Sequence, residues 1–150
     1  MKKRIIPVPE YCVGCGLCRL NCIVEHSRSK NMVKAFKDEF PKPPTGLKVL
    51  ERQPVSMALQ CRHCDEPSCV SACISGALRK HDNGLVLHDP EKCVGCYSCV
   101  MACPYGCISM LEEQKKIFKC DQCAHRDTPA CVMGCPNQAL RFVDIQSGKE

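Results

Sequence analysis

Sixteen of the 17 cysteines fall into four blocks of four, and cysteine thiolates are strong ligands for soft metals. The first and third blocks have the spacing C-x2-C-x2-C-x3-C, whereas the middle gap widens to four residues in the second block and to seven in the fourth. This repeated grouping predicts that all sixteen thiols bind metal. In chain order the blocks are Cys12, Cys15, Cys18 and Cys22; Cys61, Cys64, Cys69 and Cys73; Cys93, Cys96, Cys99 and Cys103; and Cys120, Cys123, Cys131 and Cys135.

The spacing within a block favours iron–sulfur clusters. Three cysteines at i, i+3 and i+6 on a tight loop can hold three irons of a [4Fe–4S] cubane, and the fourth cysteine ligates a neighbouring cluster. The third block, with Pro104 behind it, matches the C-x2-C-x2-C-x3-C-P run of bacterial ferredoxins. Gly14, Gly16 and Gly95 suit loops that must turn sharply. The four blocks are therefore expected to work as two pairs that exchange their last cysteines.

Two other uses of cysteine fit the sequence less well. A zinc ion takes four thiolates and has no use for a third cysteine at i+6 beside a fourth at i+10. A secreted disulfide scaffold favours an even count, yet 17 is odd, and no apolar stretch of signal-peptide length precedes Cys12. A reducing cytoplasm is therefore the expected location.

The connection between the second and third blocks bears on which blocks pair. Nineteen residues separate Cys73 from Cys93, and they predict a short helix, a turn at 82–84 and a strand at 85–88. Such a compact connection favours pairing the second block with the third, and the first with the fourth around the outside. The alternative, first with second and third with fourth, stays open on spacing alone.

The nested pairing defines four ligand sets, each with three cysteines of one block and the last cysteine of its partner. The expected fold is α+β, with two dicluster lobes like those of bacterial ferredoxins. The outer lobe would comprise residues 1–60 and 108–150, and the inner lobe residues 61–107. The sets are Cys12, Cys15, Cys18 and Cys135 (set 1); Cys61, Cys64, Cys69 and Cys103 (set 2); Cys73, Cys93, Cys96 and Cys99 (set 3); and Cys22, Cys120, Cys123 and Cys131 (set 4).

Residues 23–60 form an insert in the outer lobe. A helix is expected in its front half, RSKNMVKAFKDEF, whose apolar residues recur at near-helical spacing: Met32, Val33, Phe36 and Phe40. PKPPTG then breaks the chain, and LKVLERQPVSMALQ predicts extended structure. The insert either covers a cluster from solvent or docks on a partner, with its lysines steering it towards an acidic surface.

Cys107 is the cysteine that falls outside the blocks. After the last cysteine of three blocks the chain reads CISGAL, CPYGCI and CPNQAL. Cys107 stands where the other two segments have Ala77 and Ala139. It is therefore predicted to be a small packing residue and not a ligand.

Three further side chains near the blocks could adjust a cluster. His26, just beyond the first block, and His63, inside the second, could donate a hydrogen bond to a cluster sulfur. A surface or capping role is favoured for both histidines. Arg126 lies in the long gap of the fourth block and could also donate to sulfur, although a surface ion pair is the expectation.

The formal net charge of +5 does not predict a nucleic-acid partner. A [4Fe–4S]2+ core with four thiolates carries a charge of −2, so four clusters would bring the chain from +5 to about −3. Aromatic residues make up only 5% of the sequence, so basic and aromatic residues do not interleave. The sequence shows no P-loop, Ser–His–Asp arrangement, HExxH motif or membrane-spanning run. We expect neither an active site in this chain nor direct membrane insertion.

The order of the four blocks resembles that of a known family: C-x2-C-x2-C-x3-C, CRHCDEPSCVSAC, CVGCYSCVMACPYG and CDQCAHRDTPACVMGCP. These motifs are similar to the four-cluster iron–sulfur subunits of dimethyl sulfoxide reductase, formate dehydrogenase and formate hydrogenlyase. The resemblance covers essentially the whole chain, and in that family the nested pairing is the rule. Because all sixteen cysteines are kept, the resemblance implies four [4Fe–4S] clusters.

Within this family, EHSRSK, AFKDEFPKP and LQCRHCDEPSCV most resemble the CooF-type ferredoxin partner of nickel–iron carbon monoxide dehydrogenase. The resemblance implies a non-catalytic subunit of an anaerobic oxidoreductase complex. Such a subunit relays single electrons between a catalytic subunit and a second redox protein, for example a flavin- or NAD-linked oxidoreductase. Similar small subunits accompany tungsten or molybdenum aldehyde and formate oxidoreductases and hydrogenases, which remain alternatives. A free soluble ferredoxin carrier and a zinc-stabilised interaction module are two further alternatives.

Overall fold

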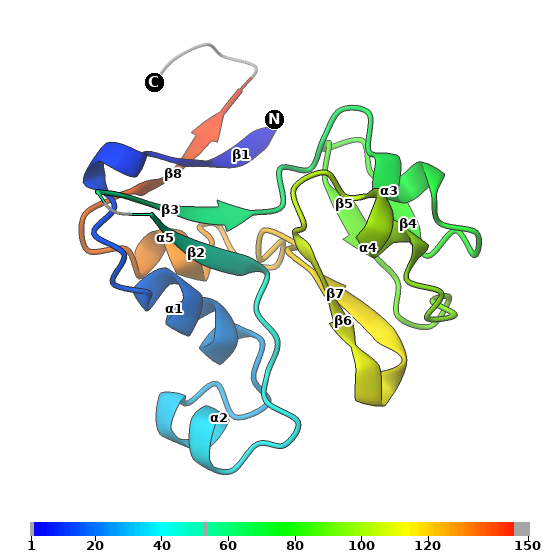
Figure 1. Cartoon of the computed structure of the whole chain (residues 1–150), viewed down its shortest axis with the longest axis horizontal. Helices are drawn as coiled ribbons and strands as arrows, with labels where there is room; N and C mark the ends of the chain where they lie inside the picture. Colours follow the sequence, from blue (N-terminus) through cyan, green and yellow to red (C-terminus); the bar gives the residue numbers. More distant parts are fainter. Residues whose placement is uncertain (1, 53, 146–150) are drawn as a thin grey trace.

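The computed structural model describes residues 2–52 and 54–145, which form two halves side by side (Figure 1). Short helices and two-stranded antiparallel sheets make up both halves, which confirms the mixture of helix and strand. Among the described residues, no helix has the length and apolar character needed to cross a bilayer. The elements are β1 (Lys3–Pro7), η1 (Pro9–Tyr11), α1 (Leu17–Glu25), α2 (Met32–Lys37), β2 (Leu47–Arg52), β3 (Val55–Gln60), α3 (Ser68–Ser71), β4 (Leu78–Lys80), β5 (Val86–His88), α4 (Ser98–Ala102), β6 (Ile108–Leu111), η2 (Glu112–Gln114), β7 (Lys116–Lys119), α5 (Ala130–Met133) and β8 (Leu140–Asp144).

The two ends of the described chain meet in the outer half. β1 pairs antiparallel with β8, from Lys3 opposite Asp144 to Pro7 opposite Leu140. Helix α1, after the first block, packs against α5, in the fourth block, with the β2–β3 hairpin beside them (Figure 1). Segments far apart in sequence therefore share one core, which contains thiols as well as apolar residues: Ile5, Cys18, Cys22, Leu47, Ala58, Cys131 and Leu140.

The inner half contains α3, α4 and the β4–β5 and β6–β7 hairpins (Figure 1). Its core consists of Leu78, Val86, Cys99, Ile108 and Ile117. The β6–β7 hairpin belongs by sequence to the predicted outer lobe, yet two of these core residues come from it. The division into lobes remains a prediction, and residues 1, 53 and 146–150 of the predicted outer lobe lie outside the described residues.

The prediction of a short helix after Cys73 is wrong. Helix α3 ends before that cysteine, and the next element is strand β4. Gly76 between them has a φ of 64°, which a right-handed helix does not accommodate, and Leu78 is buried at 1% exposure where β4 pairs with β5. The predicted turn at 82–84 and strand at 85–88 are confirmed by the β4–β5 hairpin.

The front of the insert forms the expected helix, α2. Asn31 caps it, because its side-chain oxygen accepts the Lys34 N–H at 3.1 Å. Only Ala35 of this helix is buried, so the apolar face predicted from the spacing does not cover a core. The exposed fractions are 50% for Met32, 68% for Val33, 42% for Phe36 and 79% for Phe40.

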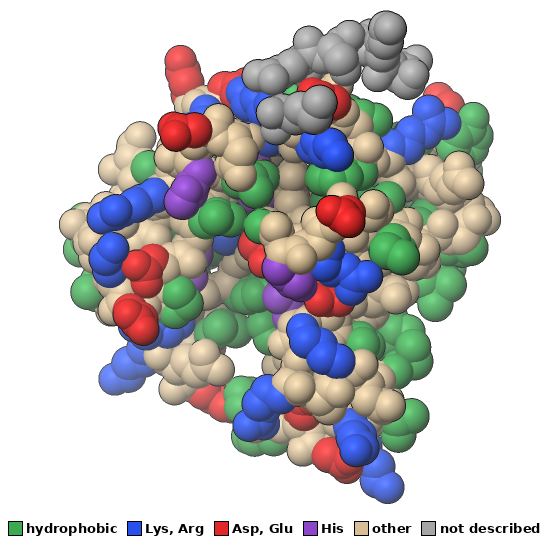
Figure 2. Space-filling model, turned by 180° about the vertical axis from the view of Figure 1, so that it is seen from behind, with side chains coloured by type: hydrophobic (Ala, Val, Ile, Leu, Met, Phe, Trp, Pro, Cys, Tyr) green, Lys and Arg blue, Asp and Glu red, His purple; other side chains and the backbone are tan. Residues whose placement is uncertain are grey.

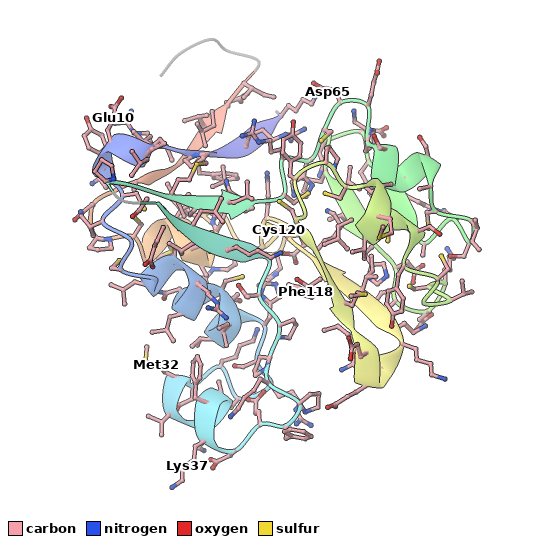
Figure 3. All side chains as sticks on the ribbon, viewed as in Figure 1. Glu10, Met32, Lys37, Asp65, Phe118 and Cys120 are labelled. Carbon is pink, nitrogen blue, oxygen red and sulfur yellow. The ribbon has the colours of Figure 1, made fainter. Side chains whose placement is uncertain are left out.

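The back of the insert forms the β2–β3 hairpin, which confirms the extended structure. Leu47 and Ala58 of this hairpin are buried in the outer core beside Cys18 and Cys22. Just before the hairpin, Gly46 N–H donates to Cys22 Sγ at 3.3 Å. The back of the insert thus covers thiols, whereas the front projects away from them, as the labelled Met32 and Lys37 show in Figure 3.

Candidate iron–sulfur sites

The four cysteine blocks share a backbone conformation at the second residue after their first cysteine. A positive φ there lets a short loop curl back on itself, and it occurs at Gly14 (70°), His63 (47°), Gly95 (70°) and Gln122 (57°). Gly16 is also left-handed, with a φ of 73°. At Gly95 an added Cβ would lie 2.2 Å from the Lys115 carbonyl oxygen, so only glycine fits. The sharp turns expected at the glycines are confirmed.

The four thiols of set 1 line one cavity in the outer half. Three come from the first block and one, Cys135, from the segment after α5. Val49, Ala58 and Leu140 supply apolar walls to this narrow space of about 20 Å³. Burial raises the pKa of the Cys18 thiol to about 11, and the other three thiols of the set raise it as well. The four sulfurs therefore lie close together.

The four thiols of set 2 line a cavity of about 210 Å³ in the inner half. Three come from the loop and helix after β3, and Cys103 comes from the end of α4. Burial raises the pKa of Cys69, and the other thiols of the set act in the same direction, whereas the Lys119 ammonium lowers it. Val86 and Ile108 complete an apolar wall.

Set 3 is brought together around the start of α4. Cys73 and Cys93 pack against the core cluster that contains Cys99. Burial and then Cys73 raise the pKa of Cys99 to about 11, and Cys69 of set 2 and Cys93 add to this effect. Cys96 is also close enough for Cys73 to raise its pKa, although hydrogen bonds from Ser98 are stronger and lower it overall. The last cysteine of the second block thus lies among three cysteines of the third.

Set 4 lies where α1 meets the fourth block. Burial and then Cys22 and Cys123 raise the pKa of Cys131 to about 12. Burial also raises the pKa of Cys120 well above its ordinary value, with Cys131 and Cys22 acting in the same direction. The last cysteine of the first block thus lies among three cysteines of the fourth.

These thiol groups have the chemistry that iron–sulfur clusters require. Thiols whose pKa is raised by burial stay protonated at neutral pH until a metal displaces the proton, so such groups gain their charge together with the metal. Within residues 2–52 and 54–145, no group of three or more His, Cys, Asp or Glu side chains is arranged to hold a single metal ion. The assignment of each cysteine as a ligand remains a prediction.

Comparison with protein families matches residues 54–145 to the 4Fe-4S dicluster domain and residues 9–22 to a 4Fe-4S binding domain. The chain belongs to the 4Fe-4S dicluster family. It is 32% identical to the electron transport protein HydN of Escherichia coli (strain K12), over 96% of this chain and 89% of HydN. It is 34% identical to an iron–sulfur protein of Rhodospirillum rubrum, over 93% and 80% of the two chains. A third relative is the "probable anaerobic dimethyl sulfoxide reductase chain YnfG" of Escherichia coli (strain K12), 33% identical over 90% and 70%.

These matches decide the cofactor and the general role. The chain is an electron-transport iron–sulfur protein that binds multiple [4Fe–4S] clusters. Iron–sulfur clusters supply one-electron chemistry over a wide range of potentials, which the protein adjusts through hydrogen bonds to sulfur, charge and burial.

Backbone N–H groups of this dicluster protein point at the cysteine sulfurs. Hydrogen bonds to sulfur stabilise the thiolate and the reduced cluster, so they raise the reduction potential. The pairs come from both halves of the fold, and each is given as the residue of the donating backbone N–H, the residue of the accepting Sγ and the N···S distance: Gly46 to Cys22 (3.3 Å), His63 to Cys61 (3.5 Å), Leu78 to Cys73 (3.4 Å), Gln122 to Cys120 (3.4 Å) and Ala139 to Cys135 (3.2 Å).

The thiol sets of the dicluster protein follow one another in the order 1, 4, 2, 3. Helix α1 links sets 1 and 4, because it carries Cys18 and Cys22. Lys119 connects sets 4 and 2, because its Nζ donates to the carbonyl of Cys120 in set 4 and to that of Val86, which lines the set 2 cavity; Cys120 lies between the two halves in Figure 3. Helix α4 links sets 3 and 2, because it carries Cys99 of set 3 and its C-cap residue is Cys103 of set 2. Sequence reasoning missed the contact of sets 4 and 2, since no local pattern signals it.

The surface or capping role favoured for the two histidines is wrong for His63, whereas His26 is the C-cap residue of α1 and so has the capping role. His63 is only 1% exposed, and its Nδ1 accepts the Val86 N–H at 2.9 Å. His26 is half-buried, with Nδ1 2.9 Å from the Cys22 carbonyl oxygen and Nε2 3.4 Å from Asp121 Oδ1. His26 Nδ1 also lies 3.7 Å from Cys22 Sγ, so this histidine contacts a thiol of set 4. His63 is held by a segment distant in sequence, which explains why the sequence gives no sign of its burial.

The interpretations of Arg126 and Cys107 agree with the structure. Arg126 forms an ion pair with Glu25 of α1 at the surface. Cys107 is buried at 8% exposure, as are Ala77 (2%) and Ala139 (5%) at the equivalent places of the repeat. Arg126 therefore serves surface pairing, whereas Cys107 also lines the cavity of set 2, so its exclusion from the ligands remains a prediction.

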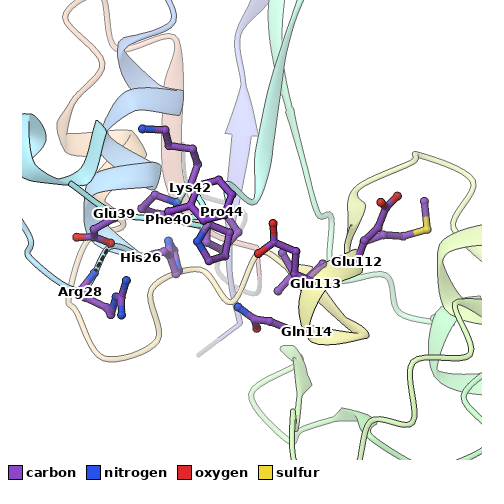
Figure 4. A pocket seen from close by; sticks show the side chains of 13 residues that line it. His26, Arg28, Glu39, Phe40, Lys42, Pro44, Glu112, Glu113 and Gln114 are labelled. Atoms are coloured by element: carbon purple, nitrogen blue, oxygen red, sulfur yellow. Dashed lines mark hydrogen bonds between the residues drawn. The ribbon is translucent and has the colours of Figure 1, made fainter. Parts of the chain in front are cut away.

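An open cavity of about 520 Å³ leads from the surface to His26, between the end of α2 and the β6–β7 hairpin (Figure 4). Charged and proline-rich segments line it, including Arg28, Glu39, Lys42 and Glu113. The Glu39 carboxylate is held at the wall of this cavity, because it accepts hydrogen bonds from the backbone N–H groups of Arg28 and Ser29. Because no cysteine lines it, this cavity belongs to the insert and not to the thiol sets.

Proposed function

We propose that this chain relays single electrons through four [4Fe–4S] clusters, one for each thiol set, between a catalytic oxidoreductase subunit and a second redox protein. Sets 1 to 4 supply the sixteen ligands as the nested pairing predicts. The chain itself acts as a conductor and carries no substrate site. Its location is the reducing cytoplasm.

The observation that carries this proposal is the continuous order of the thiol sets. Helix α1 joins sets 1 and 4, and α4 with its C-cap Cys103 joins sets 2 and 3. Sets 4 and 2 are connected through Lys119, which donates to the carbonyls of Cys120 and Val86. At one end of this order, Cys15 of set 1 is exposed, and at the other end so is Cys96 of set 3. Exposed apolar side chains accompany both, with Val13 at 67% and Val94 at 64% exposure. An exposed ligand loop at each end is what electron entry and exit require.

The partners are proposed from relatives and from resemblance. YnfG is named as a chain of a reductase, which supports a catalytic partner for this chain as well. The CooF-like segments favour nickel–iron carbon monoxide dehydrogenase, with a flavin- or NAD-linked oxidoreductase as the second protein. A tungsten or molybdenum aldehyde or formate oxidoreductase, or a hydrogenase, is the second candidate. Figure 2 shows Lys and Arg interspersed with Asp and Glu over one face, which does not suit a nucleic-acid partner.

The metal content of the natively purified protein tests the proposal. The protein is isolated without oxygen together with whatever stays bound, and Fe, Ni, Mo and W are measured per chain. We expect at least about sixteen irons per chain for four clusters. Nickel with excess iron would support the carbon monoxide dehydrogenase partner, and molybdenum or tungsten the second candidate. A colourless protein with zinc and no sulfide would refute the relay, and a chain that runs alone on native sizing would be a free carrier.

A further inference from the structure

Four buried basic or amide side chains gather where the two halves meet, around the contact between sets 4 and 2. Lys119 is the last residue of β7 and precedes Cys120, which lies at the centre of Figure 3. Arg4 donates to the His63 carbonyl, and Val86 joins the other two groups, because its N–H donates to His63 Nδ1 and its carbonyl accepts from Lys119. Their exposed fractions are 4% for Lys119, 8% for Arg4, 1% for His63 and 4% for Gln122.

The two cations of this junction bind only carbonyl oxygens. Lys119 Nζ donates to the carbonyl of Val86 and, at 3.0 Å, to that of Cys120. Arg4 Nη2 donates to the carbonyls of His63 at 2.9 Å and Gly84 at 3.0 Å. Among the ion pairs formed by residues 2–52 and 54–145, neither cation has a carboxylate oxygen within 4.0 Å.

An unpaired buried charge is strongly unfavourable, so the junction calls for an anion. The nearby carboxylate of Asp121 does not fill this role, because it lies 3.4 Å from His26 Nε2 and also accepts the Cys123 N–H at 2.9 Å. Two buried donors point to the same need. His63 Nε2 and Gln122 Nε2 have no hydrogen-bond partner within the described chain. Because His63 Nδ1 accepts a hydrogen bond, its Nε2 carries the proton of the neutral ring.

We propose that Lys119, supported by Arg4, raises the reduction potentials of the clusters in sets 2 and 4 through its fixed buried charge. This inference rests on the proposed function, since it requires clusters in those sets. Each such cluster with four thiolates carries a charge of −2 and gains one further negative charge on reduction. A positive charge held beside it stabilises the reduced form more than the oxidised form. The two central clusters then accept electrons more readily than they would without the cation. Lys119 acts through its charge and is not a ligand.

The position of Lys119 explains why one residue serves two sets. Its ammonium binds the carbonyl of Cys120, a member of set 4. The same ammonium donates to the carbonyl of Val86, a residue that lines the cavity of set 2. Low effective dielectric in the buried junction makes this charge far more effective than one at the surface.

An EPR-monitored redox titration of the anaerobically purified full chain tests the proposal. The variants are Lys119→Gln, which removes the charge, Lys119→Arg, which keeps it, and Lys34→Gln, which removes an exposed lysine of α2. Iron and sulfide are measured first on every sample. For Lys119→Gln we expect the equilibrium constant for reduction of the affected clusters to fall at least tenfold, which is 59 mV for a one-electron couple. Lys119→Arg and Lys34→Gln are expected to titrate like the wild type.

The outcomes separate this proposal from the proposed function. A wild-type protein without about sixteen irons would refute the four-cluster relay before any variant is compared. A fully loaded Lys119→Gln protein with unshifted potentials would overturn the role of Lys119, and so would an equal shift in Lys119→Arg. If Lys119→Gln loses iron, Arg4→Gln is titrated instead and is expected to lower the same potentials. Loss of iron in Lys119→Gln but not in Lys119→Arg would support the proposal that the charge of Lys119 is what matters. Loss of iron in both variants would refute that proposal.

Discussion

The ligand loops at the two ends of the thiol order differ from the two at its centre, although all four curl in the same way. The second residue after the first cysteine has a positive φ in every block. In the end loops this residue is glycine, Gly14 or Gly95, and the neighbouring Val13 and Val94 are exposed. In the central loops it is a buried polar residue of 1% or 4% exposure, His63 or Gln122.

This difference shows what each loop has to do beyond holding metal. A non-glycine residue with positive φ is strained by about 1 kcal/mol and persists only where surrounding contacts compensate. His63 has that compensation, because its ring fills the junction and accepts the Val86 N–H. The end loops need a small residue instead, since Gly95 lies against the Lys115 carbonyl. Glycine therefore marks the loops that face outward, and a buried side chain marks the loops that join the halves.

The largest expected effect comes from removing a ligand at an end loop. Cys96→Ser should lose one cluster and about a quarter of the iron. Electron transfer between the two partner enzymes should fall at least tenfold, while the catalytic partner keeps its activity with an artificial acceptor. Cys107→Ser is the matched control, because Cys107 is a buried thiol that lines the set 2 cavity but is not among the predicted ligands. Equal iron loss in both variants would contradict the ligand assignment.

A smaller but still large effect is expected from Gly95→Ala. The added Cβ would meet the Lys115 carbonyl oxygen at 2.2 Å, so the loop must shift and set 3 loses its geometry. We expect partial loss of iron from this one cluster. Iron analysis and EPR measure this loss. Gly106→Ala is the control, since Gly106 also has a positive φ of 58° but no atom lies within 4 Å of its added Cβ. Similar iron loss in the control would mean that backbone strain, and not the close contact, is responsible.

The loops could be predicted from sequence because their geometry depends on residues a few positions apart. The spacing of cysteines and the glycines at Gly14 and Gly95 report it directly. The junction could not be predicted, because its contacts join segments far apart in the chain, such as His63 with Val86 and Lys119 with Val86. A histidine or lysine has no sequence signal for burial, so the surface role was the natural expectation and is wrong for His63.

The helix expected after Cys73 failed for a related reason. Its sequence suits a helix locally, but pairing of β4 with β5 buries Leu78 and outweighs that preference. The apolar spacing in α2 predicted a helix correctly, but the pattern does not reveal whether another element covers the apolar face, and only Ala35 of this helix is buried. Local spacing thus gave the elements, and long-range pairing decided their environment.

A moderate effect is expected at the junction itself. His63→Gly relieves the positive φ but removes the acceptor of the buried Val86 N–H, which costs about 1–3 kcal/mol, and leaves a cavity. We expect the holoprotein to unfold at a lower temperature at constant scan rate. His63→Asn is the control, because asparagine tolerates positive φ and its side-chain oxygen can accept the same N–H. An asparagine variant as unstable as the glycine variant would show that ring packing, and not the hydrogen bond, holds the junction.

The smallest effect is expected at the surface of the fourth block. Arg126 lies in its long gap and pairs with Glu25 of α1, and the Arg126 side chain is 36% exposed. Arg126→Gln should therefore destabilise the protein by no more than about 1 kcal/mol, and high salt should reduce the difference. Thermal unfolding at low and high salt measures both values. Lys92→Gln, which breaks the exposed local pair of Lys92 with Asp89, is the control and should change stability less. A larger loss for Arg126→Gln that persists in salt would mean that this outward-facing contact belongs with the buried junction.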